Sequence, residues 1–146
     1  MKKYKLSAKG RKLAASSSLR SLARIMDTLL APGGCPWDRK QTHSTLIKYL
    51  REESAEVAQA VRRRDWKNLQ EELGDVLLQV VFHSALARRD GHFTLGDVIK
   101  TVNSKMVRRH PHVFGGSKLD TPAQVLRQWK LIKKAEKKGR RGGKKS

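Results

Sequence analysis

Two acidic clusters interrupt the apolar stripes of the two longest helical patterns in this sequence. The clusters are residues 52–56 (EESAE) and 71–75 (EELGD). Residues three apart share one face of an α-helix, so Glu53 pairs with Glu56 and Glu72 pairs with Asp75. These faces are also the apolar ones, with stripes of Leu46, Leu50, Glu53, Val57, Val61 and of Leu69, Glu72, Val76, Gln79, His83. A fold that buries both stripes is therefore expected to turn four carboxylates toward its interior.

Burying four carboxylates without a counter-charge is very costly, so something positive must lie among them. A hard divalent cation held by oxygen ligands, Mg²⁺ or Mn²⁺, meets this need with few groups. The alternative is an exposed acidic face whose carboxylates pair with nearby basic side chains, namely Arg62, Arg63, Arg64 or Lys67. The position of the acids on the apolar stripes favours the metal site.

The remaining patterns predict an all-α fold with about five helices. Apolar residues recur at helical spacing in several segments, and no segment has the alternation typical of a strand. Thr42 and Asp65 are suited to cap two of the helices, and Thr121-Pro122 is a typical opening of a third. The expected helices are about 19–30, 43–64, 66–89, 95–109 and 122–138.

Composition restricts the class of protein. The 146 residues suffice for one domain, expected at 19–138, and the single cysteine, Cys35, permits no disulfide within the chain. These features fit a reducing cytoplasm. No apolar run approaches the roughly 20 residues that span a bilayer, so no membrane association is expected.

The formal net charge of +20 is concentrated near the two ends of the sequence. Residues 1–18 carry six basic residues and no acid, and residues 130–146 carry nine basic residues and one acid. We expect residues 1–18 to form a flexible basic arm and residues 139–146 a disordered basic tail. Such segments attract polyanions, including nucleic acid and phosphate-bearing substrates, or act only as solvated extensions.

The acidic motifs and their flanks together resemble the MazG-type all-α nucleoside triphosphate pyrophosphohydrolases, over about residues 19–138. The short acidic motif is only moderately specific, and the ordered flanks make the resemblance strong. The matching segments are 34–38 (GCPWD), 41–43 (QTH), 49–50 (YL), 52–56 (EESAE), 72–75 (ELGD), 79–83 (QVVFH), 103–106 (NSKM), 108–115 (RRHPHVFG) and Trp129 with Lys133.

The resemblance implies Mg²⁺-dependent hydrolysis of an NTP or dNTP to the monophosphate and pyrophosphate, by attack of a metal-activated water. It implies that Glu53, Glu56, Glu72 and Asp75 are the Mg²⁺ ligands. Catalysis is then expected from Glu53 together with Glu52, which lies one step off the stripe and can orient or deprotonate the water. The family also implies a helical bundle whose four-helix core is completed by a second subunit, hence a homodimer or higher homo-oligomer.

Four further residues match family positions near the substrate. Lys105 and Arg109, four apart on one predicted helix, match residues that bind the phosphates, and Trp129 and Lys133 match residues near the nucleotide. The spacing alone also allows Lys105 and Arg109 to be a solvent-side pair, and Trp129 to be a core residue. His83 is interpreted as a hydrogen-bonded core histidine and not as a metal ligand. Trp37 and His43 either help to shape the pocket or fix a loop, and the loop role is favoured.

Two alternatives change the function or the substrate. Many bacterial members of the family carry two such domains in tandem, and the copies need not share activity. A nucleic-acid-binding or regulatory helical module with an idle nucleotide site is therefore the rival interpretation. A specialised relative acting on dUTP, dCTP or phosphoribosyl-ATP would keep the chemistry and change the substrate. The expected purpose of the reaction is clearance of nucleotides from the pool.

Overall fold

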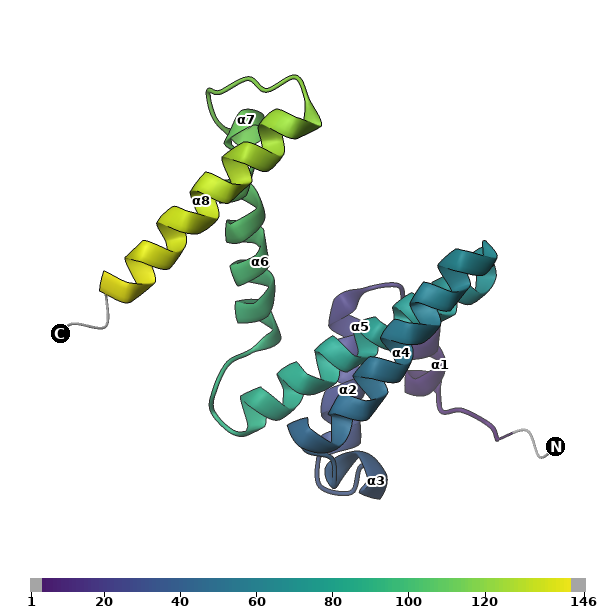
Figure 1. Ribbon diagram of the computed structural model, residues 1–146. Helices are drawn as coiled ribbons and strands as arrows, with labels where there is room; N and C mark the ends of the chain where they lie inside the picture. Colours follow the sequence, from purple (N-terminus) through teal and green to yellow (C-terminus); the bar gives the residue numbers. More distant parts are fainter. Residues whose placement is uncertain (1–3, 143–146) are drawn as a thin grey trace. The chain divides into compact units, whose positions relative to one another are not determined.

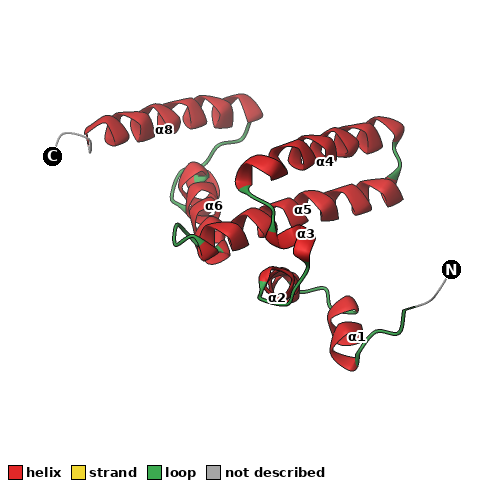
Figure 2. Cartoon of the chain, turned by 90° about the horizontal axis from the view of Figure 1, so that it is seen from below, coloured by secondary structure: helices red, strands yellow, loops and turns green. Residues whose placement is uncertain are grey.

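The computed structural model describes residues 4–142 and divides the chain into two units, with the boundary between Leu95 and Gly96. All regular structure within these residues is helical, which confirms the all-α prediction (Figures 1 and 2). None of the helices in 4–142 is both long enough and apolar enough to cross a membrane. Each unit is described by itself below.

The first unit is built on an antiparallel pair of long helices, α4 and α5, which lie side by side in both views (Figures 1 and 2). Thr42 caps α4 in a capping box, and Asp65 caps α5 by accepting a hydrogen bond from Asn68 N at 3.0 Å, as the sequence predicts. The turn between them is closed by Arg64 in the left-handed conformation. The helices of this unit are α1 (Ala8–Ala14), α2 (Leu19–Leu30), α3 (Pro36–Arg39), α4 (His43–Arg63) and α5 (Trp66–Arg89).

The apolar core of this unit joins three helices that are distant in sequence. Helix α2 packs on α5, and one end of α4 contributes to the same cluster. Burial of these side chains supplies the main free energy that holds the hairpin of α4 and α5 against α2. The buried members are Met26, Leu46, Val81, Phe82 and Leu86.

The segment between α2 and α4 folds back onto the first unit. Cys35 N donates a hydrogen bond to Leu29 O at 2.8 Å, which brings the chain close to the end of α2. A Cβ at Gly34 would lie 2.3 Å from the same carbonyl oxygen, so this approach requires glycine. Trp37, in α3, forms a T-shaped pair with Tyr49 on α4, with 5.8 Å between the ring centroids, and the Trp37 side chain remains 52% exposed.

The second unit contains α6 (Leu95–Arg109), α7 (Pro111–Phe114) and α8 (Pro122–Gly142). Thr121 accepts a hydrogen bond from Gln124 N at 3.3 Å, consistent with the predicted start of α8. Glu136 on α8 binds two arginines of α6, Arg108 at 2.8 Å and Arg109 at 2.9 Å. Because the Glu136 side chain is only 15% exposed, these ion pairs are partly shielded from solvent.

Three short helices, α1, α3 and α7, are absent from the expected set of five. Helix α1 lies within residues 1–18, where we expected a flexible arm, and Ser7 caps it by accepting a hydrogen bond from Gly10 N. Helix α8 continues through Gly142, so residues 139–142 are helical where a disordered tail was expected. The remainder of those two predictions, residues 1–3 and 143–146, lies outside the described residues.

Glu136→Gln is expected to loosen the second unit at neutral pH. Hydrogen bonds from Arg109 and then Arg108 lower the pKa of Glu136 from 4.5 to about 2. This carboxylate therefore stabilises the fold above pH 4.5, and the contribution is lost as the pH falls from 4.5 toward 2. Amide hydrogen exchange along α8 should be faster in the variant at pH 7, and the difference should vanish near pH 2.

Asp120→Asn removes a carboxylate from the same unit and serves as the control. It should leave exchange along α8 unchanged, because Asp120 forms no ion pair with the arginines of α6 in the part of the chain that the structure describes. Equal exchange in Glu136→Gln and the parent chain at pH 7 would contradict the stabilising role of these ion pairs.

Candidate functional site

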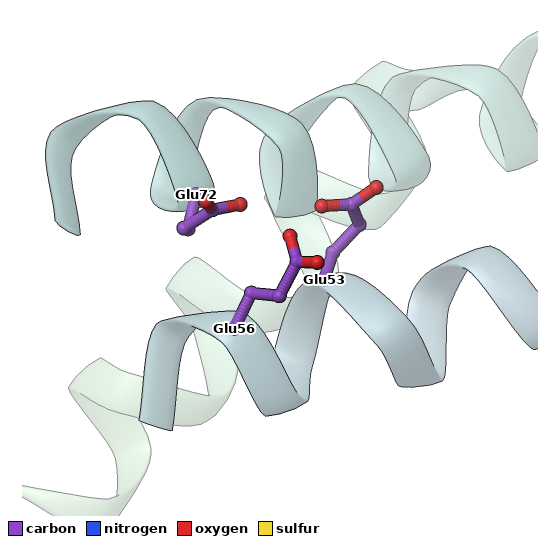
Figure 3. A group of neighbouring side chains, drawn as sticks. All are labelled: Glu53, Glu56 and Glu72. Carbon is purple, nitrogen blue, oxygen red and sulfur yellow. The ribbon is translucent and has the colours of Figure 1, made fainter. Parts of the chain in front are cut away.

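Three carboxylates converge between α4 and α5. Glu53 and Glu56 come from α4 and Glu72 from α5, and one oxygen of each lies within 4.8 Å of the others (Figure 3). The spacing of three places Glu53 and Glu56 on one face of α4, and the antiparallel hairpin brings Glu72 opposite them. The sequence analysis expected four carboxylates in this place, and the hairpin brings three of them, Glu53, Glu56 and Glu72, together.

The burial of these residues departs in part from the expectation that all four carboxylates face the interior. Glu53 and Glu72 are half-buried, whereas Glu56 and Asp75 are exposed. Asp75 is not one of the three converging groups, yet its negative charge raises the pKa of both Glu53 and Glu72. The site is therefore a partly open acidic cluster with Asp75 at its edge.

The electrostatics of the cluster are those of carboxylates without a counter-charge. Burial, followed by the neighbouring Glu56 carboxyl, raises the pKa of Glu72 to about 7. Burial also raises the pKa of Glu53, followed by the charges of Asp75, Glu56 and Glu52. Within residues 4–142 no lysine or arginine forms an ion pair with these side chains.

These carboxylates fit a hard divalent cation. Oxygen-only ligands suit Mg²⁺ and Mn²⁺, and a cation would relieve the mutual repulsion that raises the pKa of Glu72. Glu52 is exposed on the neighbouring face of α4, where its charge still reaches Glu53. The residues present can thus hold a metal ion between the two helices.

A pair of histidines lies farther along the same two helices. The Nδ1 atoms of His43 and His83 are 2.7 Å apart and the rings stack with an interplanar angle of 12°. This confirms His83 as a hydrogen-bonded histidine. The sequence analysis missed the pairing itself, since 40 residues separate the two and no local pattern links them. Two buried atoms nearby on α5, Gln79 Oε1 and His83 Nε2, have no hydrogen-bond partner in the part of the chain that the structure describes.

The four expected substrate-binding residues all belong to the second unit. Lys105 is half-buried and Lys133 is exposed. The guanidinium of Arg109 binds Glu136, as described above. Trp129 meets His110 edge to face at 5.1 Å, and its indole N–H is buried with no hydrogen-bond partner in the described residues.

Comparisons with known proteins identify the family of this chain. Residues 41–114 match the model of the MazG nucleotide pyrophosphohydrolase domain. The sequence is 53% identical over 116 residues to the nucleoside triphosphate pyrophosphohydrolase/pyrophosphatase MazG of Thermotoga maritima, covering 80% of this chain and 44% of the relative. It is 43% identical over 117 residues to the nucleoside triphosphate pyrophosphohydrolase of Escherichia coli K12, with the same coverage of 80% and 44%.

A solved structure extends the agreement to the fold. The crystal structure of a mazG-related protein from Thermotoga maritima superposes with a TM-score of 0.68 and 34% identity, covering 80% of this chain and 99% of that one. This chain belongs to the MazG nucleotide pyrophosphohydrolase domain family. It spans less than half the length of the curated relatives it matches.

Proposed function

We propose that this chain hydrolyses nucleoside or deoxynucleoside triphosphates to the monophosphate and pyrophosphate, with Mg²⁺ as cofactor and Mn²⁺ as a possible replacement. The observation that carries the proposal is the convergence of Glu53, Glu56 and Glu72 within 4.8 Å, with no ion pair to a basic side chain among residues 4–142. Membership of the MazG family and the printed names of the relatives support the same reaction.

In this proposal Glu53, Glu56, Glu72 and Asp75 hold the metal. A bound Mg²⁺ supplies charge neutralisation for the triphosphate and lowers the pKa of the attacking water. We assign to Glu52, which is exposed beside Glu53, the orientation of that water and the acceptance of its proton. Cleavage of the α–β anhydride bond consumes one water and releases the monophosphate and pyrophosphate.

We assign substrate binding to Lys105, Arg109, Trp129 and Lys133. Arginine suits bidentate contact with phosphate and lysine contributes a point charge. In the structure the Arg109 guanidinium forms an ion pair with Glu136, which fixes the orientation of the arginine side chain on α6. Trp129 offers an indole that can stack on a base. The functional domain in this proposal is 19–138, its setting is the cytoplasm and its purpose is clearance of the nucleotide pool.

A homodimer is part of the proposal. Leu73, Leu77 and Val80 lie one helical turn apart on α5 and are exposed. A continuous apolar stripe on a long helix is typical of a surface that packs on another helix.

Light scattering after size exclusion should give a molar mass twice that of the chain, and Leu77→Glu should lower the measured mass to that of the monomer. Leu131→Glu, at an exposed site on α8, is the control and should leave the measured mass unchanged. A monomeric parent chain would contradict the proposed dimer.

The rival function is a nucleic-acid-binding or regulatory module, which the concentration of basic residues near the two ends favours. A panel of eight NTPs and dNTPs with Mg²⁺, with and without EDTA, separates the two functions. EDTA-sensitive release of pyrophosphate with a monophosphate product supports the hydrolase. Absence of release from all eight by the folded chain, together with retained nucleic-acid binding, would support the rival.

The metal-free chain is expected to lose stability as the pH rises from 4.5 to about 7. In this window the folded chain keeps a proton on Glu72, whose pKa is about 7, whereas the unfolded chain releases it near 4.5. The folded state thus binds more protons, and the free energy of unfolding falls as pH rises. Urea unfolding in EDTA at a series of pH values measures this slope.

Two controls accompany the pH series. Glu72→Gln cannot titrate and should show a flatter profile across the same window, and Mg²⁺ should restore the stability of the parent chain at pH 7. An identical slope in the variant and the parent chain would show that Glu72 is not the group responsible.

A further inference from the structure

A cavity lined by basic and hydroxyl side chains lies between α1 and α2, remote in sequence from the acidic cluster. It has a volume of about 500 Å³. Helix α1 and the following link contribute one side, and α2 contributes the other. The polar residues that line it are Lys9, Lys12, Ser16, Ser21, Arg24 and Thr28.

The cavity is positively charged, and none of the side chains that line it carries a neutralising negative charge. Lys9, Lys12 and Arg24 line it, and no lining residue is acidic. Residues 1–26 contain no aspartate or glutamate, and the first carboxylate, Asp27, is bound to Arg88 at 2.8 Å. Within residues 4–142 none of the three cations forms an ion pair. Three unpaired cations around one volume attract an anion of high charge.

Hydroxyl groups complete the lining and are held in place by one another. Ser16 Oγ lies 2.7 Å from Ser21 Oγ, and Ser18 Oγ donates to the same Ser21 oxygen at 3.0 Å. Ser18 also caps α2 by accepting a hydrogen bond from Ser21 N at 3.1 Å. Ser16 and Ser21 line the cavity, and their hydroxyl groups are fixed by these hydrogen bonds. The charged side chains are thus supplemented by positioned hydroxyl groups.

We infer that this cavity is a binding site for an oligophosphate anion, through its phosphate groups alone. The lining combines lysine, arginine and hydroxyl donors, the groups that bind phosphate oxygens most strongly. It contains no aromatic ring or amide to stack on or read a base, and Leu13 is its one apolar side chain. Its volume lies within the range of small-molecule sites.

The placement of the cations favours a short oligophosphate over a nucleic-acid strand. A strand presents one charge per phosphate along an extended path and is bound by cations distributed along that path. Here the cations from two helices converge on a single cavity instead. The inference is independent of the proposed hydrolysis, since it uses none of the residues between α4 and α5 and requires no metal.

Calorimetric titration of the full chain with inorganic tripolyphosphate, in EDTA, tests the inference. EDTA removes the metal through which the acidic cluster would take the same anion. We expect saturable binding to one site per chain, and binding of a nucleoside triphosphate with a similar constant. The double variant Lys9→Ala/Lys12→Ala and the single variant Arg24→Ala should each weaken binding by roughly tenfold or more, because each loses charge-assisted hydrogen bonds.

The matched controls are Arg20→Ala for Arg24→Ala and Lys5→Ala/Arg20→Ala for the double variant, which remove the same charge from the same region at residues that do not line the cavity. They should change the affinity by less than about threefold, the effect of screened long-range charge. Arg24→Lys should restore part of the affinity, which tests charge separately from folding. Equal losses in controls and cavity variants, or no saturable binding, would overturn the inference. So would an RNA oligonucleotide that binds more tightly than tripolyphosphate and responds to the same variants.

Discussion

Glu53→Gln should reduce pyrophosphate release from the preferred nucleotide on the order of 10³-fold, the scale expected when a group that positions a catalytic charge is removed. Glu53 is a half-buried member of the cluster, and its pKa is raised by the charges of Asp75, Glu56 and Glu52 in addition to burial. Gln keeps the size of the side chain and removes its charge. The loss therefore reports on electrostatics and not on packing.

The comparison variants make this result specific. Asp75→Asn should also lower hydrolysis strongly, since its charge acts on both Glu53 and Glu72. Glu71→Gln, an exposed neighbour on α5 outside the cluster, should retain hydrolysis within a few-fold of the parent chain. Steady-state rates with and without EDTA measure all three, and binding to nucleic acid should be unaffected. Equal hydrolysis by Glu53→Gln and the parent chain would refute the metal-site hypothesis.

Phe82→Ala should lower the free energy of unfolding by about 3–5 kcal/mol, the range for removing a fully packed aromatic side chain. Phe82 is 3% exposed and belongs to the cluster that joins α2, α4 and α5. Its removal leaves a cavity where the three helices meet. Urea unfolding followed by circular dichroism gives the change directly.

Phe93→Ala provides the matched comparison for Phe82. Phe93 is 43% exposed, so the same truncation should cost about 1 kcal/mol or less. A similar cost for the two variants would mean that the core lies elsewhere than at Phe82. Because the hairpin presents Glu53 and Glu72 to each other, Phe82→Ala should also weaken metal binding, whereas Phe93→Ala should not.

Local patterns were enough to predict the long helices and their starts. Thr42 and Asp65 cap α4 and α5 as expected, and α6 covers 95–109 as expected. These features depend on residues within a few positions of one another, so they can be predicted from residue spacing. The short helices α1, α3 and α7 were missed, because one or two turns produce no recognisable apolar period.

The acidic site shows most clearly which features residue spacing predicts and which depend on the tertiary structure. The sequence by itself determined that Glu53 and Glu56 share a face of one helix and that Glu72 lies on the apolar stripe of the next. Only the hairpin decided that Glu72 meets the pair within 4.8 Å, and that Glu56 and Asp75 remain exposed. Residue spacing likewise could not predict the contact of His43 with His83, 40 residues apart, or that of Arg109 with Glu136, 27 residues apart. Helical periodicity is a property of neighbouring residues, whereas proximity between helices depends on how their apolar faces pack, which no local spacing encodes.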